Sequence, residues 1–248
     1  MRLSQILFTQ GFGTRRDCTS LVLAGLVEHG GQVLDDPEQD LDPDGLVLRV
    51  RGEDWAVYPS ALLMLHKPAG YECSQKPKHH PSVLSLLPPP LRNRGVQPVG
   101  RLDEDTTGLL LLTDDGPLIH KLTSPKHHVP KVYEVGCRHP VDDGQVARLL
   151  AGVKLVDDPA TVAAAACERT GETTLRLTLT EGKYHQVKRM LAAVGNRVET
   201  LHRSAFGPLG LTAADGAAPL APGRWRWVSA QERAALVARP GAPLTSSA

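Results

Sequence analysis

The stretch GRLDEDTTGLLLLTDDG, Gly100 to Gly116, places an acidic loop directly before the apolar run Leu109–Leu112. A short apolar run bounded by turn residues is typical of a buried strand. Asp103, which lies close to Arg101 in sequence, is therefore expected on a rigid element, where a nearby cation would keep its carboxylate ionised and able to attack carbon. The alternative is that these acidic residues only turn the chain before the strand, and spacing alone does not decide between the two.

Strand-like and helix-like runs alternate around this stretch, which predicts an α+β domain with a mixed sheet and flanking helices. Strands are expected at Leu62–His66, Leu109–Thr113, Val132–Gly136 and Thr174–Thr180. Helices are expected at Asp142–Ala151 and His185–Val194. Pro88–Pro90 predicts a loop. Residues 239–248 are rich in Pro, Ser and Ala and predict a disordered tail.

The first part of the chain has a different pattern and is expected to form a domain of its own. Two helical patterns, Leu3–Gln10 and Thr14–Ala24, are separated by Gly-Phe-Gly, and Thr14 is placed to cap the second helix. Short strands that would close a small sheet beside these helices are expected at residues 26–27, 32–34 and 45–50.

A domain boundary is predicted near residue 58. Residues 51–60 contain a glycine and a proline and look like a linker. Charge also changes there: residues 1–58 carry 5 Lys and Arg against 10 Asp and Glu, which leaves 23 against 17 for the rest of the chain. A polyanion such as RNA would therefore be attracted mainly to the second part.

The composition is that of a folded globular protein, with 41% hydrophobic and 22% charged residues. No apolar run approaches the ~18 residues that span a bilayer, and the N-terminus lacks the pattern of a secretory signal. We therefore expect a cytoplasmic protein with no membrane partner. The four cysteines include no Cys-x-x-Cys pair, which argues against a zinc ribbon and against a disulfide framework.

Two further segments carry clustered cations. EGKYHQVKRMLAAVGNRVETLHR, residues 181–203, leads from a glycine turn into an amphipathic helix that starts with four basic residues, Lys183, His185, Lys188 and Arg189. Because the N-terminal end of a helix dipole repels cations, we infer a compensating anion, either a phosphate or a buried carboxylate. A solvated charged face is the alternative. SPKHHVPKVYEV, residues 124–135, places Lys131 before a strand containing Tyr133, which would either join the core or stack on an unpaired base.

At these segments the chain resembles the RsuA-type pseudouridine synthases, which modify small-subunit ribosomal RNA. The resemblance rests on GRLD with DTTG, HKPAGYECS, TSPKHH with KVYEV, EGKYHQVKRMLAAVGN, LHR and LAPGRWRWV, which follow one another from about residue 63 to residue 228. It implies a synthase domain over residues 59–238 with a mixed, largely antiparallel sheet. It also implies a reaction that needs no metal or other cofactor, and a monomer.

The resemblance further implies a role for each matching residue. Asp103 would be the nucleophile that attacks the ribose or the base of a flipped-out uridine. Tyr133 would contact the uracil, and Lys188 would pair with Asp103 and keep it charged in a dry pocket. Arg101 would help to fill the gap that the flipped nucleotide leaves. Further basic residues are expected to bind RNA, namely Arg15, Arg16, Lys131, Lys183, His185, Arg189 and Arg203.

Residues 1–50 separately resemble the S4 RNA-binding domain, through RLSQIL, GFGTRRDCTSLVLAGLV and PEQDLDPDGLVLRV. This copy is acidic, has no lysine, and reads Val-Glu-His-Gly-Gly at residues 27–31 where the family pattern tends to read Val-x-Val-Asn-Gly. We therefore expect a domain of residues 1–58 that binds RNA weakly or through a small patch, with the synthase domain supplying most of the affinity.

The expected substrate is 16S ribosomal RNA, either free or within an assembling small subunit, because YECS, SPKHH and YHQVKRM are closest to RsuA. Sister enzymes that act on 23S RNA of the large subunit share the catalytic core and are the first alternative. A ribosome-assembly factor without catalysis is the second, and the intact Asp103, Tyr133 and Lys188 argue against it. A hydrolase that pairs Asp103 with Asp105 or Asp114 explains neither the basic helix nor the S4-like segment.

Overall fold

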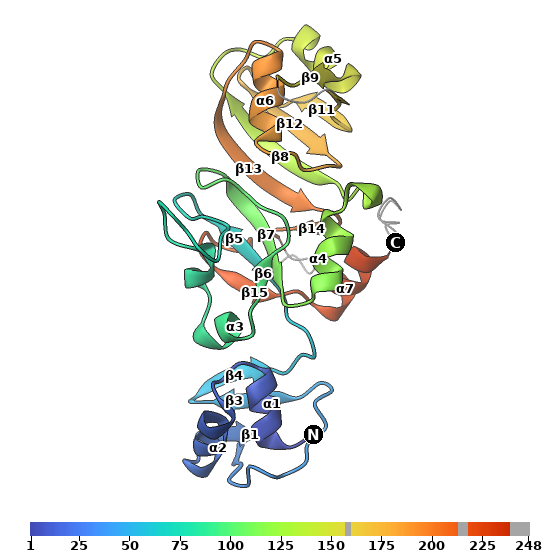
Figure 1. The fold of residues 1–248 in the computed structure, drawn as a ribbon. Coiled ribbons are helices and arrows are strands. Elements are labelled where there is room, and N and C mark those ends of the chain that lie inside the picture. The colour runs from blue at the N-terminus through green and yellow to red at the C-terminus, as the bar shows by residue number, and fades with distance from the viewer. Residues whose placement is uncertain (157–159, 213–217, 239–248) are drawn as a thin grey trace. The chain divides into compact units, whose positions relative to one another are not determined.

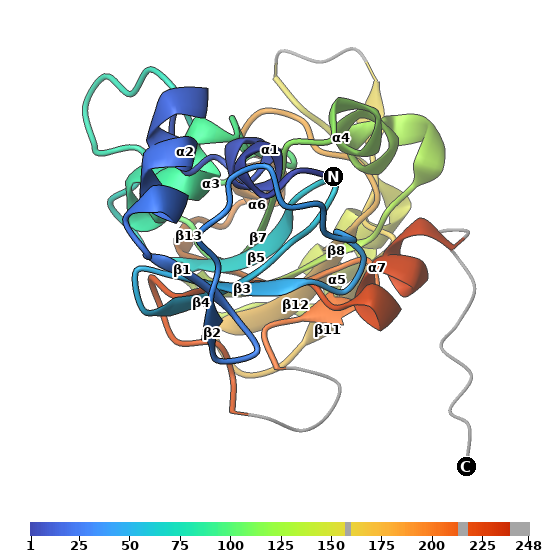
Figure 2. The ribbon, with the colours of Figure 1, turned by 90° about the horizontal axis from the view of Figure 1, so that it is seen from below.

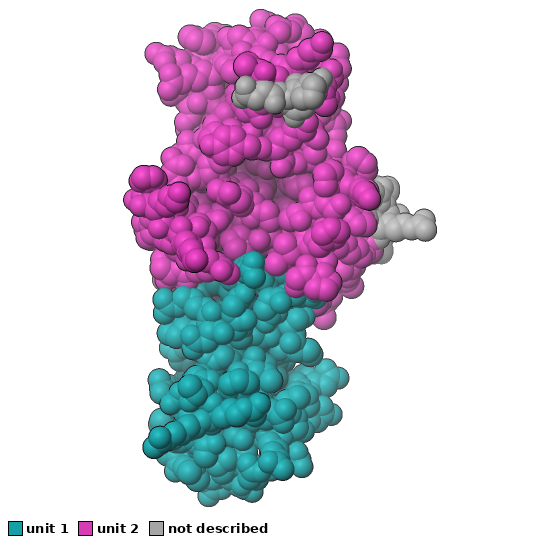
Figure 3. Space-filling view, in the orientation of Figure 1, with its two compact units in different colours: residues 1–61, 87–97, 113–115 teal, residues 62–86, 98–112, 116–248 magenta. Residues whose placement is uncertain are grey.

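The computed structural model describes residues 1–156, 160–212 and 218–238, and the chain divides into two compact units (Figures 1 and 3). Unit 1 comprises Met1–Ala61 together with two internal segments, Leu87–Gln97 and Thr113–Asp115. Unit 2 comprises the rest of the described chain. The boundary expected near residue 58 took no account of the two internal segments, and the tail expected at residues 239–248 lies outside the described residues.

Unit 1 packs two helices against a small antiparallel sheet (Figure 2). Thr14 caps the second helix as predicted, because its side chain accepts a hydrogen bond from the N–H of Asp17 while the Asp17 carboxylate accepts one from the N–H of Thr14. The helices are α1 (Leu3–Thr9) and α2 (Arg15–Leu23). The sheet has the order β2-β1-β3-β4, with β1 (Val27–His29), β2 (Gln32–Val33), β3 (Val47–Val50) and β4 (Glu53–Ala56).

Strand β4 corrects the prediction of a linker over residues 51–60. Arg51 and Gly52 both have positive φ values, 52° and 81°, which is the backbone of a two-residue hairpin turn. The turn reverses the chain, so that Val50 pairs with Glu53 and Val47 with Ala56. This turn is hard to predict from the residue types, because an arginine rarely adopts a left-handed backbone.

The segment Pro88–Pro90 is not the loop that was predicted. Pro88 caps helix α3 (Pro89–Asn93), and a proline at the start of a helix removes only an N–H that would have no helical partner there. The guanidinium of Arg94, at the end of α3, donates to the Asp114 carboxylate at 2.8 Å and to the Gln10 side chain at 2.7 Å. These contacts join the two internal segments to the rest of unit 1 and give Asp114 a structural role.

Unit 2 is built on a nine-stranded sheet with the main path β11-β12-β8-β13-β7-β5-β15 (Figure 1). The sheet is mixed, because β13 runs parallel to β7 but antiparallel to β8. Its strands are β5 (Leu62–Lys67), β6 (Gln97–Pro98), β7 (Thr107–Thr113), β8 (Lys131–Cys137), β11 (Ala166–Arg169), β12 (Thr174–Leu179), β13 (Val198–Phe206), β14 (Leu209–Gly210) and β15 (Trp225–Trp227). A separate pair is formed by β9 (Val153–Lys154) and β10 (Thr161–Val162).

Helices cover two apolar clusters on this sheet. α5 (Asp143–Ala151) and α6 (Gln186–Ala193) contribute to a cluster with β8, β12 and β13. α4 (Gly116–Thr123) and α7 (Ala230–Val237) lie side by side and contribute to a cluster with β5 and β7 (Figures 1 and 2). Within the described residues, two short 3-10 helices complete the elements, η1 (Val83–Leu86) and η2 (Pro125–His127). The strands and helices predicted for this part of the chain are all present.

Strand β13 belongs to both apolar clusters. Leu201 packs in the first and Phe206 in the second, with the buried Arg203 between them. The pairing of β13 with β8 shifts register after Arg203, which marks a bulge that re-aims the following side chains. Gly108 of β7 allows the close approach there: it has φ +112°, and a Cβ would lie 2.3 Å from the Arg203 carbonyl oxygen.

Candidate active site

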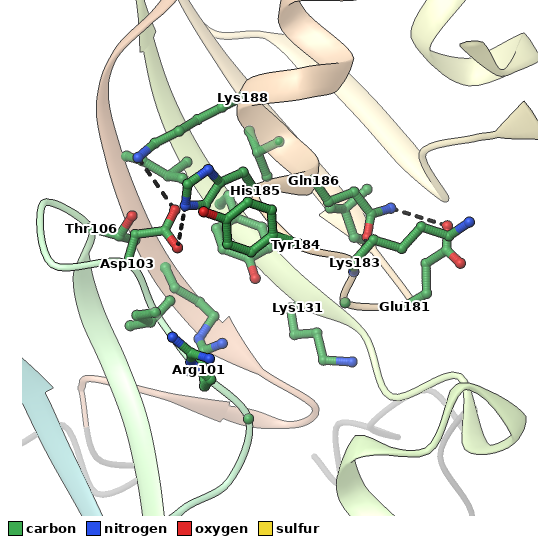
Figure 4. Close-up of a pocket in the computed structure, with 18 of the residues that line it drawn as sticks. Arg101, Asp103, Thr106, Lys131, Glu181, Lys183, Tyr184, His185, Gln186 and Lys188 are labelled. Atoms are coloured by element: carbon green, nitrogen blue, oxygen red, sulfur yellow. Dashed lines mark hydrogen bonds and ion pairs between the residues drawn. The ribbon is translucent and has the colours of Figure 1, made fainter. Parts of the chain in front are cut away.

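A pocket of about 370 Å³ in unit 2 brings together most of the predicted site residues (Figure 4). Its wall is formed by the loop before β7, by residues of β8, β12 and β13, and by the segment that starts α6. Eight predicted residues line it, Arg101, Asp103, Lys131, Tyr133, Lys183, His185, Lys188 and Arg203. Leu179, Leu201 and Phe206 add apolar surface. The pocket therefore combines two carboxylates, Asp103 and Glu181, with several cations and an apolar surface.

Asp103 lies between two nitrogen donors. Its Oδ2 is 3.3 Å from Nζ of Lys188, and its Oδ1 is 3.3 Å from Nε2 of His185 (Figure 4). The Asp103 side chain is 25% exposed, so the carboxylate is shielded but open to the pocket. The sequence prediction of a Lys188–Asp103 pair agrees with these distances, whereas the approach of His185 to the carboxylate was not foreseen.

Lys188 also binds a second carboxylate. Its Nζ donates to both oxygens of Asp105, at 2.7 and 2.8 Å. Partial burial lowers the pKa of Lys188, but the hydrogen bond from Asp105 and the charge of Asp103 outweigh it, and the pKa is raised above its usual value. Burial raises the pKa of Asp105, but Lys188 more than offsets this and leaves that pKa lowered. The two carboxylates supply the compensating anion that was inferred for the basic start of α6.

The turn before α6 orders the residues that face the pocket. The Gln186 side chain accepts a hydrogen bond from the N–H of Lys183 at 2.8 Å and donates to Glu181 at 3.1 Å. His185 caps α6 with a left-handed backbone, φ +46°, that a β-carbon makes unfavourable. Its imidazole stacks on the ring of Tyr184 at 3.8 Å between centroids, and Tyr184 is 72% exposed.

A fully buried lysine fixes the loop that carries Asp103. Lys67, the last residue of β5, donates from Nζ to the carbonyl oxygens of Pro68, Glu104 and Thr106, at 3.1, 3.1 and 2.8 Å. Burial lowers the pKa of this ammonium, although nearby acidic groups oppose the shift. The loop also accepts a backbone hydrogen bond, from the N–H of Gly70 to the Glu104 carbonyl. Asp103 is thus presented by a braced loop rather than by a free one.

Lys131 and Arg203 form the other charged part of the pocket. They are 8% and 2% exposed, and both stand over the ring of Phe206, with Lys131 Nζ at 5.5 Å and Arg203 Cζ at 5.4 Å from its centroid. Burial, helped by the charge of Arg203, lowers the pKa of Lys131 to about 8 although Glu181 opposes the shift. Figure 4 shows Lys131 apart from the group formed by Asp103, His185 and Lys188.

Three predicted RNA-binding residues lie elsewhere. Arg189, on α6, does not line the pocket, and its guanidinium donates to the Tyr184 carbonyl at 3.2 Å. Arg15 and Arg16 belong to α2 in unit 1, where the Arg15 guanidinium covers the Phe8 ring at 4.7 Å. Asp114 also belongs to unit 1 and is held by Arg94, which removes it as an acid–base partner of Asp103 in the hydrolase hypothesis.

Sequence reasoning missed three supporting residues. Lys67 ends the strand that begins with the buried apolar run at residues 62–65, and a lysine in that position indicates a buried ammonium that needs acceptors. Asp105 was considered as a turn residue or as the acid–base partner of Asp103 in a hydrolase, but not as a partner of Lys188, because that contact joins distant parts of the chain. Gln186 stands between basic residues in sequence, which drew attention away from its buried amide.

Other features bear on the predicted partners and groups. All four cysteines are free thiols. Within the described ranges, no three His, Cys, Asp or Glu side chains gather as a metal site would require. No helix in the described part of the chain has the length and apolar character needed to cross a membrane.

Comparison with known proteins places this site in a family. Residues 61–193, which include the acidic loop, β8 and α6, match the family model described as RNA pseudouridylate synthase. The chain belongs to the RNA pseudouridylate synthase family. The synthase is 39% identical to "Uncharacterized RNA pseudouridine synthase YtzG" of Bacillus subtilis, over 94% of this chain and 96% of that protein.

Further relatives agree in length and fold. Over 81% of its own chain and 82% of the relative, the synthase is 42% identical to "Ribosomal small subunit pseudouridine synthase A" of Escherichia coli K12. A solved structure described as "Crystal structure of pseudouridylate synthase" superposes with a TM-score of 0.66 at 32% identity, covering 96% of this chain and all of that one. The expected family and the mixed sheet with flanking helices are therefore confirmed.

Proposed function

We propose that this synthase converts a uridine of ribosomal RNA to pseudouridine, that the RNA is the 16S RNA of the small subunit, and that Asp103 is the nucleophile. The observation that carries the proposal is the Asp103 carboxylate, open to the pocket and 3.3 Å from each of two nitrogen donors. The ammonium of Lys188 and the ring nitrogen of His185 can both stabilise negative charge on this carboxylate, which attacks in its anionic form. The names of the relatives from Yersinia pestis and Escherichia coli support the choice of the small subunit.

The remaining roles follow from the same pocket. Tyr133 lines the pocket on β8, opposite Leu177 and Arg203 in the sheet, and we assign it the face of the flipped-out uracil. Lys188 pairs with the Asp103 carboxylate at 3.3 Å. The C1′–N1 bond of the uridine breaks, the uracil rotates, a C1′–C5 bond forms, and the proton on C5 is lost while N1 takes one up. Flipping the nucleotide costs a few kcal/mol, least where the RNA is already irregular.

We propose that the remaining cations bind the RNA around the flipped-out uridine. Arg101 and Lys183 line the pocket, and Arg101 is exposed, as a residue that replaces a flipped nucleotide must be. His185 and Arg189 extend this surface along the start of α6. In unit 1, Arg15 and Arg16 are exposed on α2 and are the proposed contacts of an S4-like domain of residues 1–58. We place the protein in the cytoplasm as a monomer that acts on free RNA or on an assembling small subunit.

The test is pseudouridine mapping of 16S and 23S RNA from cells that lack the gene, complemented with wild type, Asp103→Asn or Asp105→Asn. Asp105→Asn is the matched control, because it removes a carboxylate that binds the same ammonium of Lys188. Wild type is expected to restore one 16S site, Asp103→Asn to restore none, and Asp105→Asn to restore the site at a reduced rate.

Each other outcome contradicts a defined part of the proposal. A restored site in 23S RNA would move the substrate to the large subunit. Full modification by Asp103→Asn would contradict the assignment of the nucleophile. No change at any site on deletion of the gene, with purified protein still binding the RNA, would favour the ribosome-assembly factor without catalysis.

A further inference from the structure

Two buried cations in the pocket are only partly paired within the described residues, and this feature carries an inference that rests on the proposed function. Arg203 is 2% exposed, and its Nε donates to the Leu109 carbonyl at 2.8 Å. Its Nη2 has no hydrogen-bond partner among the described residues. Lys131 is 8% exposed, and its ammonium lies 5.5 Å from the centroid of Phe206. The charge of Glu181 also acts on this ammonium, but within the described residues no hydrogen bond or ion pair to Lys131 Nζ is found.

This arrangement is costly for the protein alone. A buried polar group without a hydrogen bond destabilises the fold, and an unpaired buried charge destabilises it more. The two cations also repel each other, as the effect of the Arg203 charge on the pKa of Lys131 shows. A face-on aromatic contact recovers only part of this cost. The unused donors line the pocket, so a ligand with acceptor oxygens would relieve the cost.

The surroundings of the two cations fit the edge of a nucleobase. Along β8 and β13, Lys131 lies opposite Phe206, and Tyr133 lies opposite Arg203. The apolar side chains of Leu179 and Leu201 line the same pocket. A flat ring stacked on Tyr133 would present its edge to the neighbouring cations, and uracil carries two carbonyl oxygens on its edge.

We propose that Lys131 and Arg203 bind the carbonyl oxygens of the target uracil and stabilise the negative charge that the base acquires during the reaction. If Asp103 attacks the ribose, the electron pair of the C1′–N1 bond passes to the uracil and spreads over O2 and O4. If Asp103 attacks C6, the pair of the C5–C6 double bond passes toward O4. In both routes the negative charge on the uracil disappears when C5 bonds to C1′, because the electron pair then forms the new bond.

The charge develops after binding, so the two cations act mainly on the rate. Donors that meet charge formed in the transition state accelerate the chemical step, and the loss of one such donor typically slows it by ~10²–10³-fold. A phosphate is the other anion that RNA offers. Phosphates remain with the hydrated strand, where the exposed Arg101 is better placed than two side chains that are 2% and 8% exposed.

The experiment combines protein variants with single-atom changes in an RNA fragment that contains the target uridine. Wild type, Lys131→Met and Arg203→Lys are compared by single-turnover pseudouridine formation on RNA with uridine, 2-thiouridine or 4-thiouridine at the target, and on RNA with a neutral methylphosphonate 5′ to it. Lys126→Met is the matched control, because Lys126 is an exposed lysine that does not line the pocket. Circular dichroism checks that each variant is folded.

The expected result is a rate on uridine lowered by ~10²-fold or more in Lys131→Met, with KM changed much less. Sulfur is a poor acceptor, so the thio substitution at the contacted carbonyl should slow wild type and Lys126→Met but add little to the defect of Lys131→Met. If Arg203→Lys fails to fold, the Lys131→Met comparison decides alone.

Two outcomes would overturn the inference. If each thio substitution slows Lys131→Met by the same factor as wild type, the lysine does not act on a carbonyl. If the methylphosphonate slows wild type but not Lys131→Met, while the thio substitutions slow both proteins equally, the cations bind a phosphate. A wild-type protein that forms no pseudouridine in the unmodified RNA would overturn the proposed function itself, and this inference with it.

Discussion

Two lysines of unit 2 are both buried, yet their surroundings differ in one respect. Lys67, at the end of β5, donates to three backbone carbonyls, whereas Lys131, at the start of β8, has no acceptor within the described residues. Burial lowers the pKa of both. The comparison teaches that burial alone does not separate a structural charge from a functional one. The number of satisfied hydrogen-bond donors separates them better, because a buried donor without an acceptor needs an explanation such as a ligand that it binds.

The largest effect on stability is expected for Lys67→Met. The substitution keeps most of the apolar volume but removes the ammonium that the carbonyls of Pro68, Glu104 and Thr106 share, and only Glu104 keeps another donor, the N–H of Gly70. The free energy of unfolding should therefore fall by about 2–4 kcal/mol. Urea unfolding of the full chain measures it. Because the same loop presents Asp103, single-turnover activity should also fall in the fraction that remains folded. If Lys67→Met is as stable as wild type, Lys67 is not the structural charge that the comparison takes it to be.

Lys131→Met should change stability in the opposite direction. It removes an unpaired buried ammonium and leaves no protein acceptor unsatisfied, so at pH 7 the free energy of unfolding should rise by on the order of 1 kcal/mol, after allowance for the access of solvent to the pocket. The same urea titration applies, with Lys126→Met as the exposed control. Destabilisation by more than 1 kcal/mol would place Lys131 with Lys67 among the structural charges.

The pH dependence of that difference sharpens the comparison. Burial lowers the pKa of Lys131 to about 8 in the folded protein, against 10.5 in the unfolded chain, so the unfolded chain binds more protons between these values. Wild type should therefore gain stability relative to Lys131→Met as the pH rises from about 8 to about 10.5, by on the order of 1 kcal/mol. Below pH 8 the advantage of the variant should be constant. A difference that stays flat across the window would contradict the lowered pKa.

The smallest effect is expected for Lys188→Met. This lysine is 28% exposed, and its main partner Asp105 is 58% exposed, so solvent screens the ion pair. The free energy of unfolding should fall by less than ~1 kcal/mol. The loss should be smaller still in 1 M salt, because the screening length there is roughly a third of its value in 0.1 M salt. Thermal unfolding at low and high salt measures it. If Lys188→Met loses as much unfolding free energy as Lys67→Met at every salt concentration, a partly exposed ion pair stabilises the fold as much as the buried Lys67 does.

Most of the fold was predictable from local pattern. The runs that became β5, β7, β8, β12, α5 and α6 have the period or length of their element, and Thr14 has the residue type that caps a helix. The failures occurred where backbone geometry overrides composition. Arg51 adopts the left-handed backbone of a hairpin turn, and Pro88–Pro90 start a helix instead of breaking the chain.

The site was predictable in its members but only partly in its contacts. Asp103, Tyr133 and Lys188 could be singled out because they stand in long, ordered motifs. The links from Lys67 to the 104–106 loop and from Lys188 to Asp105 join residues 37 or more positions apart, and no local pattern encodes them. Likewise, Lys131 and Arg203 look like ordinary RNA-facing cations in sequence, and only their burial over one aromatic ring sets them apart.

The backbone of His185 has a consequence for any attempt to evolve this protein toward higher thermal tolerance. A residue with a β-carbon at φ +46° is strained by ~1 kcal/mol or more, and glycine would relieve that strain. Libraries selected only for heat resistance should therefore accumulate His185→Gly, which discards the imidazole beside Asp103. At position 185, selection for thermal stability therefore favours glycine, whereas selection for catalytic turnover favours histidine.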